Sequence, residues 1–165
     1  MSTDKIIYLR EPLEKDVHEM LKMLNNPDIK KHFSFFNHQF TIQDVKNFIQ
    51  DSSKNKYRVD FSIVDEEDKF LGTITLKNID QHKNEAEYAI SLSEKSIGKG
   101  IAKKATDIII SKAINSFNIK TIYLNVKSDN IRAIRFYEKY GFKKYNNNRN
   151  LNNFSLIWFK LNLSN

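Results

Sequence analysis

Residues 87–105 read EYAISLSEKSIGKGIAKKA, a stretch that joins an alternating strand pattern to the start of a long helix. Two of the chain's four glycines, Gly98 and Gly100, stand at this junction with one lysine between them. The first turn of a helix presents unpaired backbone N–H groups and the positive end of the helix dipole. Because glycine has no side chain, a phosphate can approach such a backbone closely. The stretch therefore predicts a phosphate-binding helix N-terminus.

The two glycines alone leave a second interpretation open. A P-loop needs G-x-x-x-x-G-K-[ST] and a dinucleotide fold needs G-x-G-x-x-G, and neither pattern is present. Helices also begin after a glycine for purely steric reasons. The wider sequence has to decide between an anion site and a steric glycine.

The elements on either side predict an α+β fold in a single domain over residues 1–165. Three alternating segments before the glycines, 57–65, 70–79 and 86–92, indicate an antiparallel meander. After the glycines a helix, a strand and a second helix follow, which implies a parallel crossover and so a mixed, mostly antiparallel sheet. The other expected elements are strands at 6–11, 120–126 and 153–163 and helices at 13–24, 41–52, 100–117 and 130–140.

Composition narrows the possible functions. Apolar residues make up 40% of the chain and charged residues 28%, values that are ordinary for a globular protein. Absence of cysteine excludes disulfides and thiolate chemistry, and four scattered histidines make a metal site unexpected. We expect a cytoplasmic protein with no membrane segment. The net charge of +7 permits an anionic partner. No RNP-like or helix-turn-helix signature supports a nucleic-acid-binding protein.

A second motif supports the anion site. Residues 128–142, SDNIRAIRFYEKYGF, contain Asn130, Ala133, Tyr137, Gly141 and Phe142 in the spacing N-x-x-A-x-x-x-Y-x-x-x-G-F. Together with the glycine stretch, this motif resembles the GCN5-related N-acetyltransferase (GNAT) family. The resemblance is close from about residue 57 to 145 and covers the first 55 residues by element order only.

The resemblance implies a GNAT fold in which the parallel strands 86–92 and 120–126 splay apart. It also implies acetyl-CoA as the cofactor, with the diphosphate on the helix N-terminus and backbone N–H groups of the splayed strand facing the thioester oxygen. One departure from the family motif is Lys95, which replaces a Gln or Arg. The expected cofactor-binding residues are Ile90, Ser91, Leu92, Lys95, Ser96, Ile97, Gly98, Lys99, Gly100, Ile101, Ala102, Asn130, Ala133 and Tyr137.

The resemblance also implies roles for individual side chains. Tyr137 matches the family's general acid, although a core tyrosine on an amphipathic helix is the alternative. Glu87, and after it Glu85, are the candidate bases, because residues two apart on a strand point to one face. A solvent-facing strand edge, or deprotonation through a water chain, is the alternative to that role. Asn130 is expected to bind the cofactor, to cap its helix, or both.

The acceptor is the least determined feature of the sequence. In the family, acceptor recognition lies in the first helices, which here gives His32, Phe33 and Phe36 as substrate-binding candidates; packing of a helix corner is the alternative. We expect a small-molecule primary amine, and the basic charge favours an amino-sugar nucleotide. A protein N-terminus or a polyamine remains an alternative, as does a non-catalytic acyl-CoA-binding module. A homodimer is possible.

Overall fold

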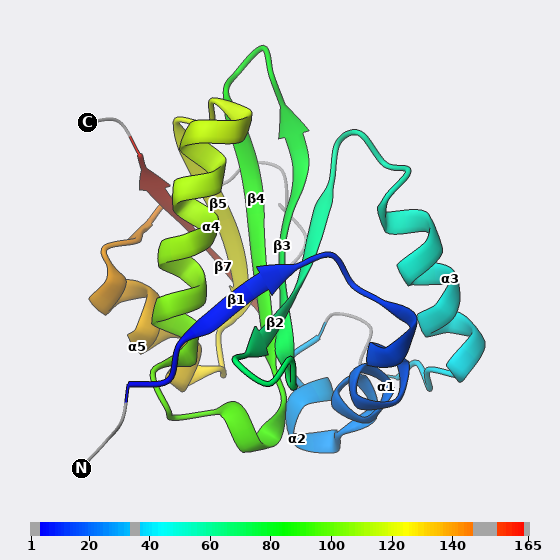
Figure 1. Cartoon of the computed structure of the whole chain (residues 1–165). Helices are drawn as coiled ribbons and strands as arrows, with labels where there is room; N and C mark the ends of the chain where they lie inside the picture. The colour runs from blue at the N-terminus through cyan, green and yellow to red at the C-terminus, as the bar shows by residue number, and fades with distance from the viewer. Residues whose placement is uncertain (1–3, 34–36, 147–154, 164–165) are drawn as a thin grey trace.

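A seven-stranded mixed sheet forms the centre of the molecule, with helices packed around it (Figure 1). The computed structural model describes residues 4–33, 37–146 and 155–163. The strands are β1 (Ile7–Arg10), β2 (Val59–Asp65), β3 (Phe70–Asp80), β4 (Glu85–Leu92), β5 (Thr121–Lys127), β6 (Lys143–Lys144) and β7 (Leu156–Asn162). The helices are α1 (Val17–Asn25), α2 (Pro27–Lys30), α3 (Ile42–Ser52), α4 (Ile101–Phe117) and α5 (Ile131–Tyr140), with 3-10 turns η1 (Glu14–Asp16) and η2 (Glu94–Ser96).

The sheet has the order β1-β2-β3-β4-β5-β7-β6, and β4 and β5 form its parallel pair. All other neighbouring strands are antiparallel, which confirms the predicted fold class. Pairing of β4 with β5 runs only from Glu85 opposite Thr121 to Glu87 opposite Tyr123. Beyond that point β4 continues to Leu92 and β5 to Lys127 without pairing to each other. The two strands therefore splay, as the resemblance implied.

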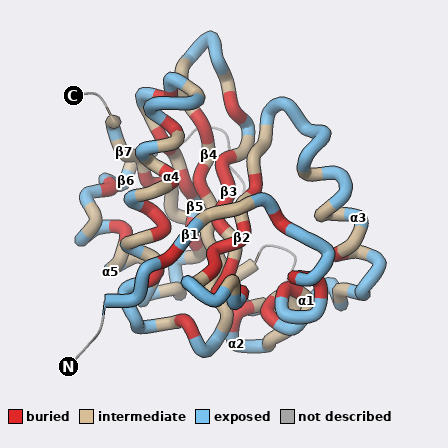
Figure 2. Tube along the Cα trace, viewed as in Figure 1, coloured by how far each residue is buried: buried red, intermediate tan, exposed pale blue. Residues whose placement is uncertain are grey.

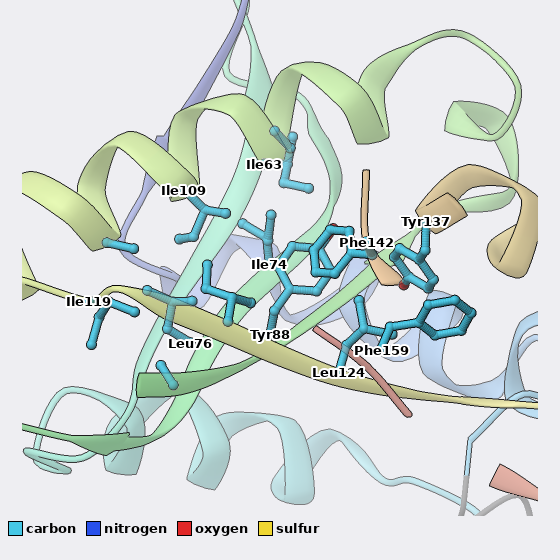
Figure 3. Close-up of a cluster of buried hydrophobic side chains, with 14 of the residues drawn as sticks. Ile63, Ile74, Leu76, Tyr88, Ile109, Ile119, Leu124, Tyr137, Phe142 and Phe159 are labelled. Carbon is cyan, nitrogen blue, oxygen red and sulfur yellow. The ribbon is translucent and has the colours of Figure 1, made fainter. Parts of the chain in front are cut away.

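The main core lies between the sheet and α4. Buried side chains on one face of α4, such as Ala105 and Ile109, pack against Ile74 and Leu76 of β3 and Ile122 of β5. Figure 2 shows the buried residues along the central strands and the inner side of α4, and Figure 3 shows the core side chains beneath that helix. Because strand side chains alternate between faces, every second residue of β4 and β5 points away from α4.

A second apolar cluster holds the first helices together. Val17, Met20 and Met23 of α1 pack with Val45 of α3 and with Phe70 of β3. A capping box starts α3: the Thr41 Oγ1 accepts a hydrogen bond from the Asp44 N–H at 3.1 Å, and the Thr41 N–H donates to Asp44 Oδ2 at 2.9 Å. These contacts fix the first helices to the sheet.

Two short elements were not predicted. Helix α2 occupies Pro27–Lys30, which lies between the helices expected at 13–24 and 41–52. The Asn26 side chain accepts a hydrogen bond from the Asp28 N–H at 2.9 Å, and Pro27 starts the helix with a suitable φ. Strand β6 lies between the helix expected at 130–140 and the strand expected at 153–163, and it pairs with β7. Among the described helices, none is long and apolar enough to cross a membrane.

Candidate active site

A cavity of about 840 Å³ opens beside the end of β4, where β4 and β5 no longer pair with each other. Its walls come from the end of β4, the start of α4, α5 and the segment around α2. Most of the predicted cofactor-binding residues meet here. The cavity is lined by Ile90, Ser91, Leu92, Ile97, Gly98, Gly100, Ile101, Ala102, Asn130, Ala133 and Tyr137.

The glycines at the start of α4 adopt the conformation that glycine favours. Gly98 has φ +79° and Gly100 has φ +77°, both in the left-handed region. A Cβ atom built on either residue would meet nothing within 4 Å, so the backbone borders open space. Gly100 is the N-cap of α4 and has no side chain to cap the first N–H groups. The loop therefore presents free amide donors to the cavity, which is the arrangement that suits an anion.

Three other residues of this loop that were predicted to bind the cofactor do not line the large cavity. Lys95, Ser96 and Lys99 line a neighbouring cavity of about 560 Å³ rather than the large one. The Ser96 hydroxyl is 2.8 Å from the Ser93 hydroxyl, and this bond closes the turn before α4. These three residues stay predictions as cofactor contacts, whereas the two glycines stand on the cavity wall.

Helix α5 closes the opposite side of the cavity. The Asn130 side chain accepts a hydrogen bond from the Ala133 N–H at 3.3 Å, so the expected N-cap is present. Both residues also line the cavity. The second role proposed for Asn130, binding the cofactor, is compatible with this position because the amide N–H₂ is not the group that caps the helix.

Tyr137 lies on α5 with its side chain in both the core and the cavity wall. Only 7% of the residue is exposed, and its ring packs against Tyr88, Phe142 and Phe159 at centroid distances of 6.1, 5.6 and 6.2 Å. Figure 3 shows the four rings grouped at one end of the core. Burial raises the pKa of Tyr137. Within the described residues, its hydroxyl has no hydrogen-bond partner.

A second cavity, of about 310 Å³, lies at the point where β4 and β5 separate. Its lining includes both candidate bases, Glu85 and Glu87, together with Asn125 and the aromatic residues Tyr123 and Trp158. These residues alternate along their strands with Ala86, Ile122 and Phe159, which belong to the core under α4. The small cavity therefore opens on the face of the sheet opposite to α4.

Glu87 is firmly held in this cavity. The Asn78 and Asn125 amides donate to its two oxygens at 3.0 and 3.2 Å, and the Lys77 ammonium lies 3.5 Å away. Only 13% of its side chain is exposed. A carboxylate oxygen has two acceptor sites; Oε2 faces both Asn78 and Lys77, whereas Oε1 accepts from Asn125 and keeps capacity for one further donor. The geometry thus leaves it able to receive a substrate ammonium or its proton.

The predicted substrate-binding residues are placed differently. His32 and Phe33 line the large cavity, beside the residues predicted to hold the cofactor. Burial and the neighbouring Lys31 lower the pKa of His32, and its Nδ1 is buried without a partner among the described residues. Phe36 lies outside the described residues. The structure therefore does not bring these residues together with Glu85 and Glu87.

Several cavity residues were missed from the sequence. Asn125, Tyr123 and Trp158 line the small cavity, and Phe136 and Tyr140 line the large one. Alternation along residues 120–126 could have indicated Tyr123 and Asn125. In the parallel pairing Glu87 lies opposite Tyr123, and residues two apart on a strand point to the same face. Trp158 could not be found this way without the pairing of β7 with β5.

The large cavity fits an acyl-CoA. Glycines with open space at the Cβ position, together with the first amides of α4, suit the diphosphate. Ile90–Leu92 pair with β3 on one side, and the edge of this segment that faces β5 is left to pair with the amides of a pantetheine arm; the apolar residues Leu92 and Ala133 also line the cavity. Acetyl-CoA is accordingly the cofactor that this donor set suits.

Comparisons with known proteins agree with the geometry. Residues 7–143 match the family model described as an acetyltransferase (GNAT) domain. An uncharacterized N-acetyltransferase p20 from Bacillus licheniformis is 27% identical over 86% of this chain and 81% of its own length. A spermidine N(1)-acetyltransferase from Escherichia coli K12 is 29% identical over 57% of this chain and 48% of its own length.

A solved structure shares the fold over nearly the whole chain. The spermidine N-acetyltransferase from Vibrio cholerae, in complex with CoA and spermine, has a TM-score of 0.82 and 19% identity, and 95% of each chain is covered. At this identity the likeness concerns the fold. The match to the family model and the glycine-lined cavity beside splayed strands together show that the chain belongs to the GNAT family of N-acetyltransferases.

Proposed function

We propose that the protein acetylates a primary amine of a small cationic molecule, such as a polyamine, that enters the small cavity. The observation that carries this proposal is the position of Glu87, which lies where β4 and β5 part and faces away from α4. Two carboxylates and two aromatic rings line that cavity, and such groups attract and hold an ammonium group. Polyamine acetyltransferases among the relatives are consistent with this acceptor class.

The amino-sugar nucleotide favoured by the net charge has less support from the site. A net charge of +7 describes the whole surface, whereas the acceptor meets only the local charge of its cavity. Within the described lining of the small cavity there is no lysine or arginine to bind phosphates. Lys77 lies nearby, but it is 3.5 Å from Glu87 and is therefore paired with that carboxylate.

Acetyl-CoA, when bound, supplies an activated acetyl thioester. The first amides of α4 and the glycine loop would hold its diphosphate, and the edge of Ile90–Leu92 that faces β5 would hold its acyl arm. Glu87 holds the acceptor and takes a proton from its ammonium group, directly or through water. Tyr137 Oη would donate the proton that the thiolate of coenzyme A needs on leaving, because burial raises the pKa of Tyr137 and keeps its hydroxyl protonated.

The test is an acetylation assay across acceptor classes. Purified protein with saturating acetyl-CoA is given spermidine, a monoamine, an amino-sugar nucleotide and an N-terminal peptide, and release of free thiol is followed. We expect the fastest turnover with a polycation. Faster turnover of the amino-sugar nucleotide or peptide would contradict the acceptor assignment, and silence with every amine would favour a non-catalytic CoA-binding module.

A further inference from the structure

A buried hydrogen-bonded link joins β4 to the first turns of α4. The Tyr88 hydroxyl lies 2.8 Å from Thr106 Oγ1, and Thr106 Oγ1 donates to the Ala102 carbonyl at 2.7 Å. Tyr88 is 2% exposed and Thr106 is fully buried. Hydroxyl groups in such a place are retained only when each finds a partner.

The direction of both bonds follows from the number of protons. Thr106 has one hydroxyl proton, which is committed to the Ala102 carbonyl. Tyr88 must therefore donate to Thr106, so the link runs in one direction from β4 through Thr106 to Ala102. Ala102 stands in the first turn of α4 and lines the large cavity.

The same link reaches the candidate general acid. The Tyr88 ring meets the Tyr137 ring edge to face, with centroids 6.1 Å apart and an interplanar angle of 88°. Because the Tyr88 hydroxyl donates its proton to Thr106, that proton is not donated to the Tyr137 hydroxyl. Tyr88 of β4 thus contacts α4 through Thr106 and α5 through the Tyr137 ring, and these two helices form opposite walls of the large cavity.

We propose that Tyr88 and Thr106 are positioning residues, which hold the first turn of α4 at the distance from β4 that the cofactor requires. This inference rests on acyl-CoA binding in the large cavity as described under the proposed function. Neither side chain lines the large cavity, so both act through Ala102 and Tyr137. Loss of the link should weaken CoA binding more than it slows the chemical step.

The test compares two threonine-to-valine substitutions. Thr106→Val removes both hydrogen bonds and keeps the side-chain shape. The matched control is Thr75→Val: Thr75 is 6% exposed on β3, and its hydroxyl donates to Asp60 at 2.6 Å. Thr75 alternates with Ile74 and Leu76, so it lies on the face away from the core under α4. Thr106→Ser restores the hydroxyl and serves as the rescue.

The readouts are the Kd for CoA by titration calorimetry and amide hydrogen exchange over residues 101–104. For Thr106→Val we expect the Kd to rise about threefold to tenfold, in line with one or two lost hydrogen bonds, and exchange of the first α4 turn to accelerate. Thr75→Val should lower the melting temperature without changing the Kd. Thr106→Ser should bind CoA as the wild type does.

Equal CoA affinity in the two valine variants would overturn the inference and leave the link a purely structural one. If Thr106→Val does not fold, Tyr88→Phe decides the question: Thr106 keeps its bond to Ala102 in this variant, and we expect a Kd rise of about twofold. An unchanged Kd for Tyr88→Phe in that case overturns the inference. Failure of the wild type to acetylate any amine concerns the proposed function alone, because the CoA comparison needs no acceptor.

Discussion

The two cavities on either side of the parting strands differ in size, lining and charge. The large one, about 840 Å³, has a glycine loop, a helix N-terminus and the largely buried Tyr137 in its wall. The small one, about 310 Å³, has carboxylates, amides and aromatic rings. The first suits a long anionic ligand with an acyl arm, and the second suits a compact cation. Under the proposed function, the acyl-CoA and the amine would approach from opposite faces of the sheet and meet in the gap between β4 and β5.

This comparison is why the proposed acceptor rests on the local lining of the small cavity and not on the net charge of the chain. The chain carries +7, yet carboxylates converge where the strands part. Changes made on one side should therefore alter one ligand and spare the other. The four predictions that follow test this separation.

The largest effect is expected for Tyr137→Phe. Removing the hydroxyl takes away the proton donor but leaves the ring that packs on Phe142 and Phe159, so kcat should fall about 10²-fold or more. The Kd for CoA, measured by calorimetry, should change little. A parallel loss of CoA affinity would show that Tyr137 is only a wall of the large cavity.

Glu87→Gln should act on the other ligand. Loss of the charge should raise the KM for a polyamine about tenfold to a hundredfold, because a charge-assisted contact is replaced by a neutral one. CoA affinity should stay at the wild-type value. Glu11→Gln, a change at an exposed glutamate beyond β1, is the control and should leave both constants unaltered. An equal KM in the two variants would place the acceptor elsewhere.

Gly100→Ala should affect the large cavity alone and more modestly. Alanine at φ +77° strains the backbone by about 1–2 kcal/mol, and a shift of the loop should raise the Kd for CoA about fivefold. Gly141→Ala is the matched control, since Gly141 has φ +120° and its Cβ would meet only Leu161 at 3.8 Å. That variant should lose stability and keep its CoA affinity. A weaker CoA affinity in Gly141→Ala together with an unchanged affinity in Gly100→Ala would show that the glycine loop does not bind the cofactor.

The smallest effect is expected for alkaline pH. Burial raises the pKa of Tyr137 above its ordinary value of 10.0, so the hydroxyl stays protonated as the pH rises toward 10. A proton donor with a raised pKa loses its proton at a higher pH. We therefore expect kcat at saturating substrates to stay constant from pH 8 to 10. A fall in kcat below pH 10 that disappears in Tyr137→Phe would contradict the assignment.

Much of the fold was predictable because its signals are local. Alternation predicted β2, β3 and β4, and the helical patterns predicted α1, α3, α4 and α5. Helix α2 and strand β6 were not predicted, because neither has a strong local signal. Helix α2 is a single turn held by the Asn26 cap, and β6 forms through its pairing with β7. These two segments of four and two residues carry too few positions for a periodic pattern.

The candidate site was predictable in part. Gly98 and Gly100 were found from their place before a helix, and Asn130 and Tyr137 from the motif that resembles the GNAT family; all four line one cavity. Lys95 and Lys99 are neighbours of the glycines in sequence, but they line a different cavity. Adjacency along a loop does not determine which way its side chains point.

The sequence by itself determined the order of elements, the left-handed glycines before α4 and the tyrosine on α5, since these depend on nearest neighbours along the chain. Only the tertiary structure decided that Glu87 faces away from Tyr137, that Asn125 and Trp158 join it, and that Tyr88 bonds to Thr106. Strand register and splay set these relations. They arise from pairing between segments far apart in sequence, which no local pattern records.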